Sequence, residues 1–212
     1  MPVVSYPGLA LHALCVELPS PLETLPSPEW LQALLRLEAE APVRGGEGVR
    51  TAVRDMLRVH GYRPTGRGKP SSEYLAAAIG DGRLGSINAA VDAGNAASLH
   101  SGLPISVIDL DLCKAPLCVD VPTAGSSYAF NRGGQEIDVA GLVSLCDTAG
   151  PCANAVKDAQ RTKTTPATLR VLATVWGADS PDSGHAPRTA AWLRELFERL
   201  GAKVELVSRA AE

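Results

Sequence analysis

Aromatic side chains are scarce in this chain and make up 4% of its 212 residues. Proteins that hold single-stranded nucleic acids usually stack the bases on exposed aromatic rings. A binding surface built on base stacking is therefore not expected. With so few aromatics, the core has to be assembled from Ala, Val, Leu and Ile.

An excess of positive charge is also lacking, because 20 Lys and Arg stand against 23 Asp and Glu and give a formal net charge of −3. Binding along a long nucleic acid needs a broad basic field. We therefore expect no DNA partner, and any contact with RNA has to be local.

Long apolar runs are absent: none approaches the ~20 residues that cross a bilayer. The first residues, MPVVSYPGLALHALCVEL, carry no basic segment ahead of their apolar part, as a signal peptide would. We expect no membrane partner and a cytoplasmic location.

The five cysteines are an odd number, which does not favour a disulfide framework. Cys113-x4-Cys118 and Cys146-x5-Cys152 can be read as zinc ligand pairs, but both spacings are wider than the usual C-x2-4-C. Cys118 and Cys146 also lie in apolar, strand-like runs, where small buried thiols are common. We expect no metal or other cofactor. No cysteine has a sequence neighbour that would lower its pKa, so a thiol nucleophile is not expected either.

Catalytic signatures such as a phosphate-binding loop, a G-x-S-x-G elbow or an H-E-x-x-H helix are missing. What the chain does have is a well-marked helix and strand between Gly85 and Asp111. Ser101-Gly102 followed by Pro104 ends the helix, and Ile105 to Leu110 reads as a short buried strand.

That helix carries two stripes at helical spacing. The apolar stripe consists of Ile87, Val91 and Leu99, and the polar stripe of Asn88, Asp92, Asn95 and Ser98. Asn and Asp are weak helix formers, so a role in hydrogen bonding to loops or to a ligand would explain their presence. Structural hydrogen bonding and direct ligand contact both remain open for these residues.

The remaining pattern predicts helices first, strands in the middle and a strand-helix-strand close, which is typical of the α+β class. The expected helices are one that starts at Ser27-Pro28 and buries Trp30 to Leu37, one marked by Val49 to Leu57, one over Glu73 to Ile79, and one over Ala190 to Leu200. The expected strands are Ala10 to Glu17, Leu117 to Val121, Ser127 to Phe130, Glu136 to Val139, Leu142 to Cys146, Leu169 to Trp176 and Lys203 to Val207.

Two polar segments are candidates for ligand contact. One is the basic loop RPTGRGK, in which Arg63, Arg67 and Lys69 either serve a solvated connector or meet phosphates. The other runs from Lys157 to Thr165, either a solvated hinge or a pocket wall whose cations meet phosphates while Asp158 or Gln160 reads a small polar group.

Asn88 to Asp111, with Arg63-Pro64 upstream and Arg161 to Pro166 downstream, resembles the editing (B3/B4) domain of the phenylalanyl-tRNA synthetase beta subunit. The likeness is greater to free-standing relatives of that domain, in which N-x-x-V-D-x-x-N-x-x-S leads into S/T-G-L-P-I and D-L-D. It extends over about Arg63 to Arg170 and implies a layered, β-sandwich-like α+β fold with mixed or antiparallel sheets and helices on one side.

The resemblance also implies an activity, hydrolysis of a wrongly attached amino acid from the tRNA end, in which an acidic group reads the misplaced side chain and a water attacks the ester. It gives Asp158, Ser106 and Asn88 as candidate catalytic residues. The expected substrate-binding residues are Asn95, Asp109, Lys157, Arg161, Thr162, Lys163 and Thr164, and the expected RNA-binding residues are Arg63, Arg67 and Lys69.

The chain departs from the family pattern at two places. Ser106 stands where the synthetase has a histidine, and Ala153 to Lys157 replaces the R-W-N-W-R run of the free-standing relatives. Asp109 matches the aspartate of the synthetase segment.

We expect one domain over 1–212, with 63–170 as the core of the resemblance, 1–62 as an N-terminal strand and helices, and 171–212 as the closing strand-helix-strand. The expected function is deacylation of a mischarged aminoacyl-tRNA in trans, with the aminoacylated CCA end as partner. A non-catalytic module that binds a tRNA, an amino acid or a protein is the alternative. A small-molecule hydrolase would need a nucleophile or metal that the sequence does not display.

Overall fold

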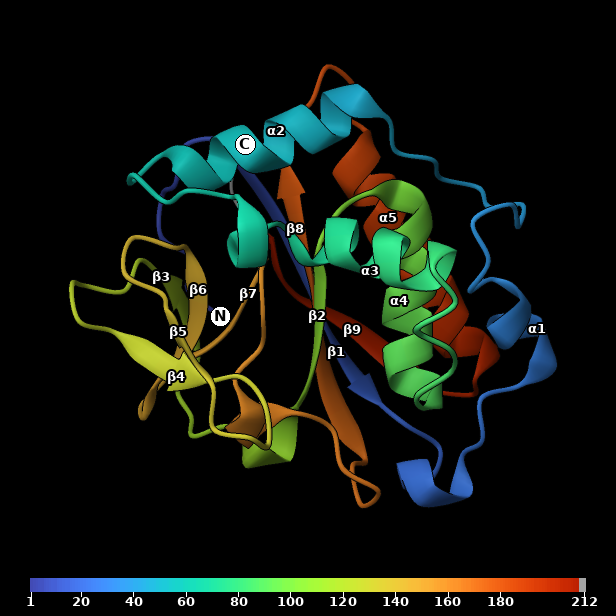
Figure 1. The fold of residues 1–212 in the computed structure, drawn as a ribbon. Helices are drawn as coiled ribbons and strands as arrows, with labels where there is room; N and C mark the ends of the chain where they lie inside the picture. The colour runs from blue at the N-terminus through green and yellow to red at the C-terminus, as the bar shows by residue number, and fades with distance from the viewer. Residues whose placement is uncertain (210–212) are drawn as a thin grey trace.

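The computed structural model describes residues 1–209, which form an α+β fold with antiparallel sheets and helices. Figure 1 shows helices α4 and α5 on one side of the main sheet and the short strands β3 to β7 on the other. The helices are α1 Glu29–Ala33, α2 Glu47–Arg58, α3 Ser71–Gly80, α4 Ala89–Ser101 and α5 His185–Arg199. Single 3-10 turns occur at η1 Leu22–Thr24, η2 Gly66–Gly68, η3 Leu110–Leu112 and η4 Gln160–Thr162.

The main sheet has four strands in the order β2-β8-β1-β9, and all neighbours are antiparallel. Its strands are β1 Leu9–Glu17, β2 Ile105–Asp109, β8 Arg170–Ala178 and β9 Lys203–Arg209. Every residue of β8 after Arg170 is buried, because layers cover the strand from both sides. This strand is the centre of the core.

The short strands form a three-stranded sheet, β3-β6-β7, and a two-stranded hairpin, β4-β5. Their bounds are β3 Cys118–Asp120, β4 Ser127–Ala129, β5 Glu136–Asp138, β6 Ser144–Asp147 and β7 Gly150–Asn154. Strand β7 contacts β2, so this layer packs against the edge of the main sheet that carries Ser106.

Helix α4 ends at Ser101-Gly102 as its sequence predicts, but it begins at Ala89, after the Ile87 and Asn88 that the predicted stripes include. The Asn88 side chain accepts a hydrogen bond from the Val91 amide at the N-terminus, and Gly102 adopts the left-handed conformation at the C-terminus with φ of 73°. At Gly94 the helix lies so close to β2 that an added Cβ would sit 2.5 Å from Val107 Cγ2. The absence of a side chain at Gly94 therefore sets the distance between α4 and the strand of Ser106.

The prediction of the two stripes on α4 is wrong in its burial. Ile87 lies before the helix and is 56% exposed, whereas Asp92 is fully buried and accepts hydrogen bonds from Ser86 Oγ and the Ile87 amide. Ser98 is buried as well and donates to the Leu103 carbonyl. Alanines fill the contact with the rest of the core, so the polar stripe holds loops in place instead of facing water.

Other boundaries differ in instructive ways. Strand β7 was not predicted, because Gly150-Pro151 is typical of a turn, and α5 begins at His185 and not at Ala190. Helix α1 is a single short segment that leaves Leu37 46% exposed. Ser27 is not the N-cap of α1, and Ser71 and Ser72 are the first residues of α3, since Pro28 and Pro70 occupy the N-cap positions.

None of the helices within residues 1–209 has the length and apolar character that spanning a membrane requires.

Replacing Gly94 by alanine tests the close approach of α4 to β2. We expect Gly94→Ala to lower the free energy of unfolding by about 1–3 kcal/mol, because the new methyl group overlaps the stiff Val107 side chain. Gly85→Ala is the matched control, since nothing lies within 4 Å of its added Cβ. Equal urea midpoints for the two variants would show that Val107 moves aside without cost.

Candidate functional site

The candidate site is built where the loop between β7 and β8 crosses the end of β2. An antiparallel bridge joins Ile108 to Lys163, and the loop between Asn154 and Lys163 carries the polar run that the sequence singles out. Figure 1 shows this loop between the layer of short strands and the main sheet. The crossing brings Ser106 on β2 against Asp158 in the loop.

Ser106, Asp158 and Trp176 form one hydrogen-bonded chain. The Ser106 hydroxyl lies 2.6 Å from Asp158 Oδ1, and Trp176 Nε1 donates to Ser106 Oγ at 2.9 Å. Ser106 and Trp176 are buried, while Asp158 is partly exposed. A hydroxyl has one proton, so its donation to Asp158 fixes the direction of the chain from the indole toward the carboxylate.

The environment of Asp158 makes it a weak acid. Burial raises the pKa of its carboxyl from 3.8 to about 6, and this shift is opposed by the hydrogen bond from Ser106 and by the charge of Lys163. The group is mostly ionised at neutral pH and takes up a proton just below it. A partly buried carboxyl with such a pKa next to cations is typical of functional sites.

Asn154 holds the turn that presents this carboxylate, and sequence reasoning missed it. Its Oδ1 accepts hydrogen bonds from the Val156 and Lys157 amides at 2.8 and 3.0 Å, and its Nδ2 donates to the Tyr128 hydroxyl at 2.5 Å. Tyr128 in turn donates to the Lys157 carbonyl. The available signal was the asparagine itself, since asparagine favours turns, but it is a weak one and the strand that it ends, β7, was not predicted.

A cavity of 470 Å³ opens beside this turn, between the loop that precedes α3 and the β4-β5 hairpin. Its lining residues are Tyr62, Arg67, Gly68, Phe130, Gln135, Glu136, Ile137, Asp138 and Lys157. A second cavity, of 380 Å³, lies between α1 and the segment before α4, and none of the predicted site residues lines it.

Two cations, Arg67 and Lys157, line the first cavity, and Lys163 contacts the Phe130 of its lining without lining it itself. Lys157 Nζ lies 4.0 Å from the centroid of the Phe130 ring, and Lys163 Nζ donates to the Phe130 carbonyl at 2.6 Å. Burial, followed by the charges of Arg67 and Lys163, lowers the pKa of Lys157. Burial also lowers the pKa of Lys163, although Asp158 opposes that shift. An anion bound among these cations would relieve their mutual repulsion.

Several predicted site residues use their polar side-chain atoms for hydrogen bonds within the protein and not for a ligand. Asn88 caps α4 and donates to Thr164 Oγ1, and the hydroxyl of Thr162 donates to backbone carbonyls in the interior. Asp109 accepts from the Asp111 amide and from the Thr168 hydroxyl. These bonds account for why such residue types stand there.

The other predicted cations and Asn95 lie apart from the Ser106 and Asp158 pair. Arg63 and Lys69 are exposed on the loop that contributes Arg67 to the cavity, and Asn95 is partly exposed on α4. Arg161 turns away toward the β6-β7 hairpin, where it forms a bidentate ion pair with Asp147 at 2.6 and 2.8 Å. Of the predicted site residues, the structure brings together Ser106, Lys157, Asp158, Lys163 and Arg67.

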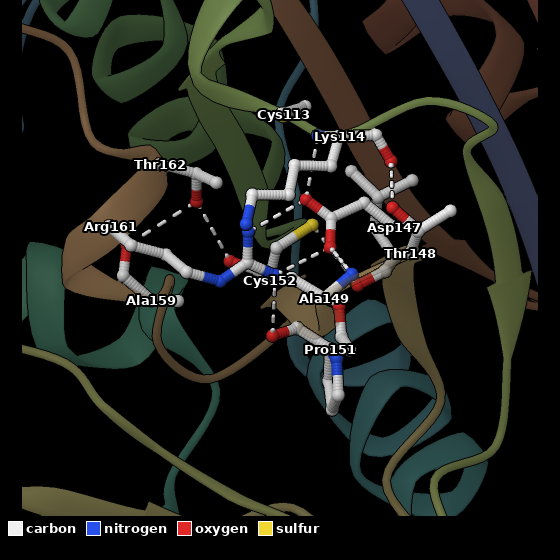
Figure 2. Close-up of polar contacts among 12 residues, drawn as sticks. Cys113, Lys114, Asp147, Thr148, Ala149, Pro151, Cys152, Ala159, Arg161 and Thr162 are labelled. Carbon is white, nitrogen blue, oxygen red and sulfur yellow. Dashed lines mark hydrogen bonds and ion pairs between the residues drawn. The ribbon is translucent and has the colours of Figure 1, made fainter.

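The side chains that are closest to a metal-ligand arrangement are Cys113, Asp147 and Cys152, whose candidate ligand atoms all lie within 4.8 Å of one another. Figure 2 shows the Arg161 guanidinium reaching the same carboxylate. Asp147 also accepts from the Lys114 and Ala149 amides, so its oxygens are already occupied. Burial acts to raise the pKa of Asp147, but these hydrogen bonds outweigh it and the pKa is lowered.

Comparisons with known proteins leave the family open. No family model matches the sequence, and no curated protein matches it. Among solved structures, the fold is similar to an N-terminal fragment of the phenylalanyl-tRNA synthetase beta-subunit from Pyrococcus horikoshii, with a TM-score of 0.46 and 12% identity. The match covers 92% of this chain and 46% of that chain, so this chain spans less than half of the neighbour's length.

The raised pKa of Asp158 makes stability depend on pH in a defined direction. The native state holds the carboxyl proton of Asp158 more tightly than the unfolded state, so the contribution of Asp158 to stability falls as pH rises from about 4 to about 6 and then levels off. The Asp158→Asn variant lacks this loss. The free energy of unfolding of Asp158→Asn, relative to that of the wild type, should rise by an amount on the order of 2 kcal/mol across that window, measured by urea unfolding. Parallel pH profiles for the two proteins would contradict the assignment.

Arg161→Met tests whether this arginine is structural. The Asp147 side chain has no exposed surface, so removing its partner leaves a buried charge, and we expect a loss of about 3 kcal/mol in unfolding free energy. Arg170→Met is the matched control, because the Arg170–Asp111 pair is exposed and should contribute less than about 1 kcal/mol. A loss of less than about 1 kcal/mol in Arg161→Met would show that the ion pair is not needed for stability, and Arg161 would again be a candidate for ligand binding.

Proposed function

We propose that this chain hydrolyses the ester bond of a mischarged aminoacyl-tRNA in trans. The observation that carries the proposal is the partly buried Asp158 carboxyl, held by Ser106 beside Lys163 and next to a 470 Å³ cavity lined by Arg67 and Lys157. The sequence resemblance of residues 63–170 to the editing domain family supports the same reading.

The proposed site contains a carboxylate and several cations, which suits a substrate that carries both positive and negative groups. The tRNA end offers phosphates, and the attached amino acid offers an ammonium group and, in some cases, a side-chain hydroxyl. In the proposal Arg67 and Lys157 contact phosphate oxygens, as Arg and Lys commonly do in RNA complexes. Asp158, ionised at neutral pH, accepts a hydrogen bond from the ammonium or hydroxyl of the amino acid. Contacts of this kind are local and suit a chain with a net charge of −3.

Ser106 acts in this proposal as a positioning residue. Its buried hydroxyl donates to Asp158 and accepts from Trp176, so it has no free geometry for attack on an ester. Water is therefore the nucleophile: it adds to the ester carbonyl, the bond to the ribose oxygen breaks, and free amino acid and tRNA leave. The resemblance assigns most of the water activation to the ribose hydroxyl of the substrate and to backbone groups.

The alternative is a non-catalytic module that binds a tRNA, an amino acid or a protein in the same cavity. The occupied Ser106 hydroxyl favours it, because this proposed site then contains a recognition carboxylate and cations but no protein nucleophile. The two functions share their ligand contacts and differ in turnover.

Deacylation of a panel of mischarged tRNAs by the purified protein distinguishes them. We expect turnover of at least one mischarged species, reduced roughly ten- to a hundredfold in Asp158→Asn and in Lys163→Ala, since a hydrogen bond to a charged group contributes about 1.5–3 kcal/mol. Lys203→Ala is the control, because that lysine is exposed on β9.

The outcomes of this panel separate cleanly. Turnover that survives in both site variants would move the active site elsewhere. No turnover across the panel, with tRNA binding that is weakened by Lys163→Ala, would establish the binding module in place of the deacylase.

A further inference from the structure

Two cysteines that are far apart in the sequence meet beside the Arg161–Asp147 ion pair. Cys113 follows η3 at the end of β2, and Cys152 lies in β7. Both sulfurs and an Asp147 oxygen lie within 4.8 Å of one another. Figure 2 shows the Cys152 sulfur beside the Asp147 carboxylate. Cys113 is partly exposed, whereas Cys152 is buried. The pair therefore consists of a partly exposed cysteine and a buried cysteine close to it.

The surroundings make the two thiols unequal. A hydrogen bond with Cys152 lowers the pKa of Cys113, and the Arg161 guanidinium acts in the same direction, against burial and Asp147. The same hydrogen bond and burial raise the pKa of Cys152. Cys113 is thus the thiol that ionises first, with Cys152 as its proton-bearing neighbour. The sequence expectation considered only neighbours along the chain, whereas Arg161 and Cys152 reach Cys113 from another part of the chain.

A metal ion does not fit this cluster as it stands. The carboxylate of Asp147 receives four N–H groups, two from Arg161 and one each from the Lys114 and Ala149 amides. Two sulfurs then remain, next to a guanidinium cation, whereas zinc prefers four ligands and loses affinity beside a positive charge. The reaction that remains open to the two cysteines is the formation of a disulfide between them.

We propose that Cys113 and Cys152 are a peroxide-sensitive thiol pair that closes to a reversible disulfide. The Cys113 thiolate attacks one oxygen of hydrogen peroxide, the O–O bond breaks, and Cys113 becomes a sulfenic acid as hydroxide leaves. The Cys152 thiol then attacks the sulfenic sulfur, the S–S bond forms, and the hydroxyl departs with the Cys152 proton as water. Both sulfurs are oxidised, and the two peroxide oxygens are reduced to water.

The disulfide would act on the loop that carries Asp158. The Cys152 carbonyl accepts hydrogen bonds from the Ala159 amide at 2.8 Å and from the Thr162 hydroxyl at 3.2 Å. The same residue thus anchors the loop through its backbone and meets Cys113 through its sulfur. This proposal does not depend on which ligand the cavity binds.

The remaining cysteines supply internal comparisons. Cys118 and Cys146 face each other on β3 and β6, but burial raises the pKa of Cys146 to about 12. Cys15 on β1 has a raised pKa, also from burial. The raised pKa values hold the thiols of Cys146 and Cys15 in their protonated, less reactive form.

The test treats the reduced full chain with an equimolar amount of hydrogen peroxide, quenches with an alkylating reagent and maps the peptides by mass spectrometry. We expect a linked Cys113–Cys152 peptide that a thiol reductant releases. Cys152→Ser should stop at a Cys113 sulfenic acid trapped by dimedone, and Cys15→Ser should behave as wild type. In the wild type, Cys113 should alkylate at least about tenfold faster than Cys146, because the thiolate is the reactive form.

Three results would overturn the proposal. One is a Cys118–Cys146 link formed in preference to Cys113–Cys152. Another is oxidation of Cys113 to sulfinic acid in the wild type without any link. The third is equimolar zinc in the purified protein that is lost in Cys113→Ser. The wild-type peptide map decides the first two results without relying on any variant.

Discussion

The buried Asp147 carboxylate is the constraint around which this half of the molecule is arranged. It stands at the end of β6 with no exposed side-chain surface, and a charge in that position has to be matched by donors. Arg161 supplies two of them from the loop after β7, and the Lys114 amide supplies another from the segment after β2. One carboxylate therefore ties three separate parts of the chain together, and its partners fix the path of the loop that presents Asp158.

Asp158 and Asp147 are two acids in one loop system with opposite properties. Asp147 accepts four N–H groups and has a lowered pKa, whereas Asp158 has the Ser106 hydroxyl, an Asn154 backbone hydrogen bond and a nearby lysine and has a pKa of about 6. The difference lies in how many N–H and O–H groups reach each carboxylate. Saturation makes Asp147 a structural group, and incomplete saturation leaves Asp158 able to accept a further donor from a ligand.

Much of the local architecture could be predicted from the sequence. The Ser101-Gly102 stop signal lies directly at the end of α4, and the apolar residues of β1 and β8 are close together in the chain, so both are visible in a short window. Ser106, Lys157, Asp158 and Lys163 came from a polar run and a family resemblance, and the structure places them together.

What escaped the sequence depends on partners far along the chain. In the sequence, Arg161 lies in a basic run that is typical of phosphate contacts. In the structure it forms an ion pair with Asp147, because the β6-β7 hairpin lies next to it. Asp92 reads as a wet helix position until Ser86 and Ile87 fold back on it. The free cysteines have neighbours on other elements: Cys113 lies near Cys152, and Cys118 lies opposite Cys146. Their sequence spacing instead groups Cys113 with Cys118 and Cys146 with Cys152. In each case the sequence pattern singled out the residue, but the groups that surround it in the structure come from other parts of the chain.

The burial of β8 on both faces has a consequence for the order in which the molecule opens. A strand that lies between β2 and β1 and is covered by helices on one side and short strands on the other can exchange its amides only when most of the structure has come apart. The loop that holds Asp158 leads directly into this strand. Its far end is thereby attached to the slowest-opening part of the protein.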